Sequence, residues 1–262
     1  MFTAVLSEAA NRALERTRFS DVRWVDETGS TNADLTAAAR VGACDGTVLV
    51  ADHQTAGRGR ADRVWTAPPG SSLLLSVLLR PSAAFAPFAG MAVGVAATDG
   101  IAAATGVQVR LKWPNDLVWP GRGDGSDKKL GGILAEADWS NSDAPAVVVG
   151  LGLNVNWPST FPADLQQIAT SVNHVAGHDV DRQALLVAIL QALDTRVGDQ
   201  RLVDAVRERS ATLGTRVRVE LPASVVEGTA TDLTPQGHLV VHADDGRRHT
   251  ITAGDVVHLR PR

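Results

Sequence analysis

Arginine and glycine alternate in one short stretch of the sequence, and this composition favours contact with anions. The stretch and the two residues that follow it closely are Gln54-Thr-Ala-Gly57-Arg58-Gly59-Arg60, Arg63 and Trp65. Glycine lets backbone N–H groups approach a phosphate or carboxylate, and arginine supplies a planar, permanently charged fork for the same anions. We therefore predict an anion-binding loop over residues 54–65. A solvated basic turn is the alternative.

A second segment, Lys112-Trp-Pro-Asn-Asp116, brings an ammonium, an amide and a carboxylate together within five residues. Pro114 should end the preceding strand, because proline cannot donate a ladder hydrogen bond. A carboxylate at such a strand end could hold Mg²⁺ while the lysine meets a polyphosphate. An ordinary Asn-Asp turn is the alternative explanation of this pentapeptide.

Lysine is rare in this chain and confined to one span. Among 25 basic residues, the lysines are Lys112, Lys128 and Lys129. Lysine offers a compact point charge where arginine offers a planar fork, so this clustering favours contact with phosphate. Lys129 also begins Lys-Leu-Gly-Gly132, whose two glycines leave room for a ligand or a crossing backbone. Chance clustering in an arginine-rich chain is the alternative.

Several familiar motifs are incomplete or absent. Gly150-Leu-Gly152 follows an apolar run as in dinucleotide-binding fingerprints, but Val155 occupies the position of the third glycine. No Walker A sequence is present, so an ATP site would have to be built differently. His174 and His178 lie four residues apart without an accompanying cysteine or Glu-x-x-His pattern, which is more typical of a surface than of zinc. We assign no metal ligand to histidine.

The overall composition narrows the class of protein. The 262 residues carry a formal charge of -4, which disfavours a cationic nucleic-acid-binding surface. Cys44 is the single cysteine, which excludes an internal disulfide and a cysteine-rich metal cluster and fits a reducing cytoplasm. The longest apolar block, Leu73–Leu79, is far shorter than the ~20 residues of a transmembrane helix. Residues 1–18 lack the apolar run of a secretory signal.

Hydrophobic periodicity predicts an α+β chain, in which helices flank a mixed β-sheet. Helices are expected within residues 1–18, 33–40, 88–104 and 185–193. Core strands are expected at residues 47–51, 73–79, 107–113, 130–137 and 146–155. Five short strands with turn signals after residue 213 predict a small SH3-like β-barrel, giving domains 1–213 and 214–262. The glycine-rich stretch 120–127 should be a mobile surface loop.

Five motifs, in their order along the chain, closely resemble those of the biotin protein ligases. They are Gly29-Ser-Thr-Asn32, residues 54–60, residues 112–116, Lys129-Leu-Gly-Gly-Ile-Leu134 and Gly150-Leu-Gly-Leu-Asn154. The resemblance implies a class II synthetase-like catalytic fold and a reaction in two steps. Biotin and ATP, with Mg²⁺, would give biotinyl-5′-AMP and pyrophosphate. The biotinyl group would then pass to one lysine of a biotin carboxyl carrier domain.

The resemblance also implies roles for individual residues. Biotin would contact Ser30, Thr31, Asn32, Gln54, Gly57, Arg58, Gly59, Arg60, Lys129, Gly132 and Gly150. The nucleotide would contact Arg60, Arg63, Trp65, Lys112, Asn115, Lys129 and Asn154, with Trp65 sheltering adenine. The catalytic charges would be Arg58, Arg60, Lys129 and Asp116, where Asp116 holds Mg²⁺ or accepts the proton of the acceptor lysine. Ala61-Asp62 stands where many family members carry Arg-Gly, so the second part of the loop is less cationic.

The expected partner is the carrier domain, with no nucleic acid and no membrane, and the chain should be a monomer or weak homodimer. About twenty residues precede Val22, so the resemblance implies the monofunctional type without the winged helix-turn-helix of some members. A lipoate ligase or octanoyl transferase is the nearest alternative, and it would be expected to lack the motifs at 57–60 and 112–116. A non-catalytic adaptor that docks partners through its barrel is the second alternative.

Overall fold

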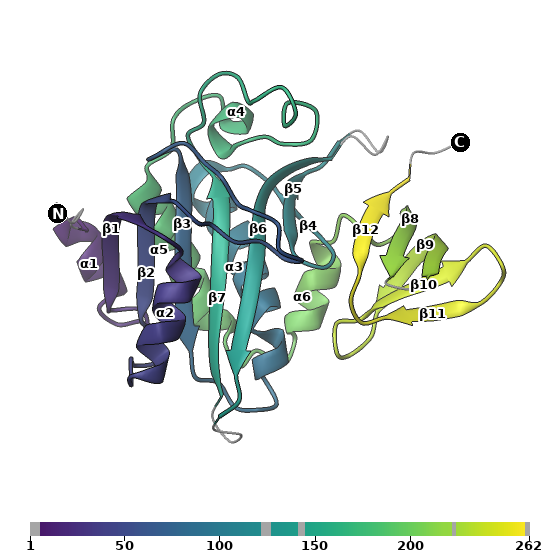
Figure 1. The fold of residues 1–262 in the computed structure, drawn as a ribbon, viewed down its shortest axis with the longest axis horizontal. Helices are drawn as coiled ribbons and strands as arrows, with labels where there is room; N and C mark the ends of the chain where they lie inside the picture. Colours follow the sequence, from purple (N-terminus) through teal and green to yellow (C-terminus); the bar gives the residue numbers. More distant parts are fainter. Residues whose placement is uncertain (1–5, 122–126, 141–144, 222–223, 260–262) are drawn as a thin grey trace.

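The larger of two sheets forms the centre of the molecule. The computed structural model describes residues 6–121, 127–140, 145–221 and 224–259. The larger sheet has seven strands in the order β1-β2-β3-β7-β6-β5-β4 (Figure 1). β1 and β2 run parallel, and the other neighbouring pairs are antiparallel. The strands are β1 (Val22–Thr28), β2 (Val48–Gln54), β3 (Ser72–Leu79), β4 (Arg110–Lys112), β5 (Asp116–Trp119), β6 (Lys128–Asp138) and β7 (Ala146–Asn154).

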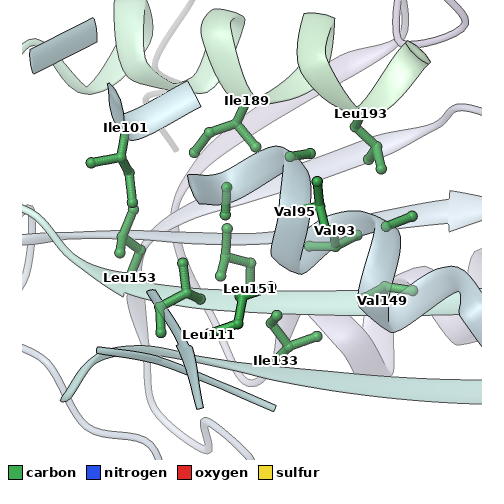
Figure 2. Packing of buried hydrophobic residues seen from close by; sticks show 14 of the residues in the cluster. Val93, Val95, Ile101, Leu111, Ile133, Val149, Leu151, Leu153, Ile189 and Leu193 are labelled. Atoms are coloured by element: carbon green, nitrogen blue, oxygen red, sulfur yellow. The ribbon is translucent and has the colours of Figure 1, made fainter. Parts of the chain in front are cut away.

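Helices cover both faces of this sheet. α3 (Ala89–Thr105) and α5 (Arg182–Arg196) pack together on one face, and their apolar side chains meet those of the strands (Figure 2). On the other face, α2 (Thr31–Arg40) packs Leu35 against Leu78 and Val148. The remaining helices are α1 (Glu8–Leu14), the 3-10 helix η1 (Ala86–Phe88), α4 (Val172–Ala176) and α6 (Leu202–Glu208).

The side chains along β7 alternate between the two faces of the sheet. Val149, Leu151 and Leu153 point to α3 and belong to the main core (Figure 2). Because successive side chains of a strand point to opposite faces, Gly150 and Gly152 lie on the side away from α3. The bulky residues thus anchor the sheet on its helical layer, while the glycines leave the opposite face open.

The predicted helix at 88–104 is confirmed as α3. It is apolar nearly all round because it lies between the sheet and α5, with Val93, Val95 and Ile101 almost fully buried. The segment Ala86–Thr105 is long and apolar enough to cross a bilayer, yet its apolar residues are used in this core. Gly100 allows the close approach of α5, since a Cβ there would lie 2.7 Å from the backbone nitrogen of Ile189.

The strand expected at 107–113 is wrong in extent. Only Arg110–Lys112 is extended as β4, and the chain then turns back into β5, so Asp116 lies on a strand that pairs with β6. Strand β1 and helices α4 and α6 were not predicted. The edge strand β1 buries Trp24 alone, so its sequence gives little periodic apolar signal.

The C-terminal sheet contains five antiparallel strands in the order β11-β10-β9-β8-β12. They are β8 (Arg216–Leu221), β9 (Ser224–Leu233), β10 (Leu239–Ala243), β11 (Arg248–Ile251) and β12 (Asp255–His258). The number and position of these strands agree with the prediction. Within the described residues, no ladder joins the edge strands β11 and β12, so the sheet is not closed into the expected barrel.

Candidate functional site

A cavity of about 620 Å³ lies on the face of the large sheet away from α3. Its lining includes three glycines of the sheet: Gly132 and Gly152 are register partners on β6 and β7, and Gly150 lies two residues earlier on β7. A Cβ at Gly152 would lie 2.7 Å from the Trp65 ring, and one at Gly150 would lie 2.3 Å from Asn32 Oδ1. These positions must therefore be glycine for the neighbouring side chains to pack this closely against the strands.

The N-terminus of α2 forms one wall of the cavity. Ser30 is its N-cap, and Ser30, Thr31 and Asn32 are each at most 4% exposed. The backbone N–H and the hydroxyl of Thr31 both donate to Gln54 Oε1, at 2.8 and 3.1 Å. This contact fixes the end of Gln54 at the cavity wall, so the structure brings these four predicted biotin contacts together.

The Asn32 amide is committed to partners inside the protein. Its oxygen accepts a hydrogen bond from the Ser76 hydroxyl at 2.6 Å, and its nitrogen donates to Leu134 O at 3.1 Å and Glu136 Oε2 at 2.9 Å. Ser76, on β3, is fully buried. Asn32 therefore joins α2, β3 and β6 beneath the cavity.

The glycine-rich segment forms a tight loop over the cavity. Its two sides meet as an antiparallel bridge between Arg58 and Val64, and Gly59 N donates to Arg63 O at 2.6 Å. The Ala61-Asp62 departure lies at the tip, where both residues are left-handed with φ of 52° and 58°. That backbone region favours glycine, asparagine and aspartate over most side chains, so Ala61 occupies an uncommon conformation.

Each arginine of the loop contacts a different part of the molecule. Arg58 forms a two-pronged ion pair with Glu136 on β6, at 3.0 and 2.6 Å. Arg60 donates to Asn115 Oδ1 at 3.0 Å, and Arg63 forms an ion pair with Asp255 on β12. The loop is thereby tied to β6, to the turn between β4 and β5, and to the C-terminal sheet.

Sequence reasoning did not assign a role to Glu136. Its carboxylate accepts both the Arg58 fork and the Asn32 amide, so it joins the loop to the start of α2. The available signal was an acidic residue near the end of the apolar run predicted as a strand at 130–137. Such a residue suggests a nearby cation but does not identify it.

Lys129, Asp116 and Lys112 form the charged end of the cavity. Lys129 Nζ lies 2.7 Å from Asp116 Oδ1 and 5.7 Å from the centre of the Trp65 ring. Burial lowers the pKa of Lys112, while the carboxylates of Asp116 and Asp127 act in the opposite direction. Within the part of the chain that the structure describes, Lys112 and Arg60 form no ion pair, which leaves these two cations free to meet an anionic ligand.

Two buried polar atoms in the cavity wall have no hydrogen-bond partner among the described residues: Trp65 Nε1 and Asn154 Oδ1. The Asn154 nitrogen donates to Thr170 O at 3.0 Å, so its oxygen is the free end of the amide. An unpartnered buried polar group costs about 1–3 kcal/mol. A ligand that accepts from Trp65 and donates to Asn154 would satisfy both atoms.

Among the predicted site residues, one group lines this cavity: Ser30, Thr31, Asn32, Gln54, Arg58, Gly59, Arg60, Arg63, Trp65, Lys112, Asn115, Asp116, Lys129, Gly132, Gly150 and Asn154. Gly57 is not part of the lining and acts through the loop. A Cβ on Gly57 would lie 2.4 Å from Trp65 O, so glycine is required where the two sides of the loop meet.

Family models match most of the chain. The model of the Biotin/lipoate A/B protein ligase family matches residues 33–154, and that of the Biotin protein ligase C terminal domain matches residues 212–259. The first model covers much of the cavity lining, although Ser30, Thr31 and Asn32 precede it, and the second covers the C-terminal sheet. The fold and cavity thus define the class of biotin and lipoate protein ligases, and the C-terminal match favours its biotin branch.

Comparison with individual proteins agrees with this branch. The chain is 41% identical over 250 residues to a biotin--[acetyl-CoA-carboxylase] ligase of Mycobacterium tuberculosis, covering 90% of this chain and 88% of that protein. It is 33% identical over 237 residues to the bifunctional ligase/repressor BirA of Bacillus subtilis, covering 87% and 71%. The structure of the biotin protein ligase from Aquifex aeolicus in complex with biotin and ATP matches with a TM-score of 0.76 and 26% identity, covering 93% and 100%. The chain belongs to the biotin protein ligase family.

Proposed function

We propose that this protein joins biotin to ATP and then transfers the biotinyl group to a lysine of a biotin carboxyl carrier domain. In the first step, a biotin carboxylate oxygen attacks the α-phosphorus of ATP, and the bond to the pyrophosphate leaving group breaks. In the second step, the acceptor amine attacks the carbonyl carbon of biotinyl-5′-AMP, and AMP leaves. The observation that carries the proposal is the cavity floor of glycines with cations grouped at one end.

The uncharged end of the cavity fits the biotin ring system. Ser30, Thr31 and Gln54 offer hydroxyl and amide groups on a rigid wall, which suits a ureido ring that both donates and accepts hydrogen bonds. Gly132 leaves space between Lys129 and Trp65 over the strands, and Gly150 makes room for the Asn32 amide. Asn32 supports this wall through its internal hydrogen bonds.

The charged end of the cavity fits the carboxylate and the phosphates. Two anions must come together for reaction, so cations that hold them in contact lower the barrier. Lys129 lies where it can meet both groups, and none of the described residues forms an ion pair with Arg60 or Lys112. Arg63 and Asn154 would complete the nucleotide side, with adenine beside Trp65. Arg58 would act with Glu136 to hold the loop in place.

The residues present fit Mg²⁺ that arrives with ATP. No cluster of three or more potential ligands occurs among the described histidine, cysteine and acidic residues. Mg²⁺ in nucleotide sites is commonly held by one or two carboxylates together with substrate phosphates and water. Asp116 would supply the carboxylate, and the ion would stabilise negative charge on the phosphates when bound.

Transfer requires the acceptor lysine to lose its proton. Asp116 is the carboxylate that we propose as the base, because it lines the cavity beside Lys129. We further propose that residues 1–213 form the catalytic domain and residues 214–262 an SH3-like domain. The exposed free thiol of Cys44 favours a cytoplasmic location.

The test is biotin-dependent exchange of pyrophosphate into ATP, followed by biotinylation of a purified carrier domain. Exchange with biotin and Mg²⁺ but not with lipoate or octanoate would support a biotin ligase. A carrier domain whose acceptor lysine is replaced by arginine is the matched control for the second step. Exchange with lipoate instead would favour the lipoate branch, and no exchange with any acid would favour a binding protein.

A further inference from the structure

A polar cluster is buried where the C-terminal sheet meets the catalytic sheet. His258 at the end of β12 has a side chain only 6% exposed, and the Asp127 side chain is 15% exposed. His258 Nδ1 lies 2.9 Å from Asp127 Oδ2, and Nε2 lies 3.2 Å from Thr212 Oγ1. Asp127 ends the stretch 120–127 that is expected to be a mobile surface loop, and its side chain takes part in this cluster. Residues 122–126 of that stretch lie outside the described residues.

When the His258 ring is neutral, the hydrogen bonds of this cluster have one consistent direction. The backbone N–H of Trp113 donates to Thr212 Oγ1 at 3.0 Å, so the Thr212 hydroxyl can donate its own hydrogen to His258 Nε2. The other ring nitrogen then donates to the Asp127 carboxylate. Burial lowers the pKa of His258, and the positive charge of Lys112 lowers it further, against the opposing effect of Asp127. The neutral ring with its hydrogen on Nδ1 therefore satisfies every contact.

The two ends of this cluster contact the segments that carry the catalytic charges. Asp127 precedes β6, whose second residue is Lys129, and its other oxygen accepts a hydrogen bond from Gly121 N at 2.8 Å. Trp113 lies between Lys112 and Asp116 in the turn from β4 to β5. One histidine of the C-terminal sheet thus connects the two segments that form the charged end of the cavity.

Docking of the two sheets alone does not require these polar groups. A buried carboxylate is costly unless it is hydrogen-bonded or paired, and an apolar contact could join two surfaces without that cost. Other contacts already hold the C-terminal sheet to the rest of the protein, since Trp113 Nε1 donates to Gly237 O at 3.1 Å and Arg207 on α6 pairs with Asp232 at 2.8 Å. What the cluster adds is a fixed carboxylate whose charge acts on Lys112.

We infer that His258 is a positioning residue for the nucleotide step: it fixes Asp127, and through Asp127 and Thr212 it sets the placement of Lys112 and Lys129. The inference rests on the proposed function and assigns the C-terminal sheet a part in it. His258 itself contacts no reacting atom. Its role is to hold the β4–β5 turn and the start of β6 in register.

Two amide variants separate the halves of the cluster. In His258→Asn the amide nitrogen takes the place of Nδ1 and keeps the bond to Asp127, whereas in His258→Gln the amide oxygen keeps the bond from Thr212 and the Asp127 bond is lost. We expect His258→Gln to raise the KM for ATP in biotin-dependent exchange about tenfold, the effect of losing one hydrogen bond to a charged group. His258→Asn should stay within about threefold of the unsubstituted protein. The Kd for biotin, measured alone, should be unchanged in both variants.

Asp232→Asn is the matched control, because it weakens an ion pair between the same domains away from the cavity. It should leave the KM for ATP unchanged. Asp127→Asn is an independent variant that removes the carboxylate charge, and it should raise the KM for ATP like His258→Gln. Equal KM values for His258→Asn and His258→Gln, or an increase in Asp232→Asn as large as that in His258→Gln, would overturn the inference. An unsubstituted protein without biotin-dependent exchange would overturn the proposed function itself, and this inference with it.

Discussion

Lys129→Ala is the substitution that bears most directly on the first chemical step. Adenylate formation should slow by ~10²–10³, which corresponds to about 2.7–4 kcal/mol of transition-state stabilisation. The ion pair with Asp116 is too weak to explain a loss of that size, because the two side chains are 38% and 26% exposed. Pairs as exposed as this contribute about 0–1 kcal/mol to stability. A loss near three orders of magnitude would therefore reflect charge that acts in the transition state.

Single-turnover formation of biotinyl-5′-AMP is the appropriate assay, with transfer from supplied biotinyl-5′-AMP measured separately. Transfer should suffer less, because the phosphoryl chemistry is already complete. Lys128→Ala is the matched control. Lys128 Nζ donates to Gln166 O at 3.1 Å, and alternation along β6 turns it away from Lys129.

The unpaired carboxylate left by Lys129→Ala contributes to the expected loss, since Asp116 would then face the phosphates without its partner. The double variant Asp116→Asn/Lys129→Ala measures this contribution, provided that Asp116→Asn alone is also measured. The reasoning would be refuted if Lys128→Ala were the more damaging single change. It would also be refuted if Lys129→Ala slowed both half-reactions equally.

Three further outcomes are expected. Arg60→Gly should release biotinyl-5′-AMP roughly 10–150-fold faster, because one charge-assisted contact is lost. The released adenylate should then label lysines of other proteins. Labelling confined to the carrier domain would contradict the idea that the loop retains the adenylate. Gly152→Ala should displace the Trp65 ring, because the added Cβ would lie 2.7 Å from it. A calorimetric titration should then show ATP binding weakened by about 2–10-fold. An unchanged Kd for ATP would mean that adenine does not lie beside Trp65. The free energy of unfolding should decrease as the pH falls below 6.5, the ordinary pKa of histidine, because His258 binds a proton in the unfolded chain that burial disfavours in the fold. Measured by urea unfolding, this decrease should be shallower in His258→Asn, by at most about 1.4 kcal/mol per pH unit.

The types of residue in the site and much of its local structure follow from the sequence alone. The glycines at 132, 150 and 152 and the loop of alternating glycine and arginine are recognisable within single short segments, although the side chains that fill the space beside Gly150 and Gly152 come from distant segments. The apolar run that became α3 was equally clear, because a helix buried on all sides needs apolar residues around its whole circumference. These features could be predicted without knowing which segments would meet.

Which charges pair, in contrast, depends on the tertiary structure. Arg58 and Glu136 are 78 positions apart, and Asp127 and His258 are 131 apart, so no local pattern relates them. The same limit explains the missed turn into β5: a strand of four residues is defined by its ladder with β6 more than by its own sequence. Ion-pair partners and short strands follow from contacts between distant segments, and those contacts exist only once the sheet has formed.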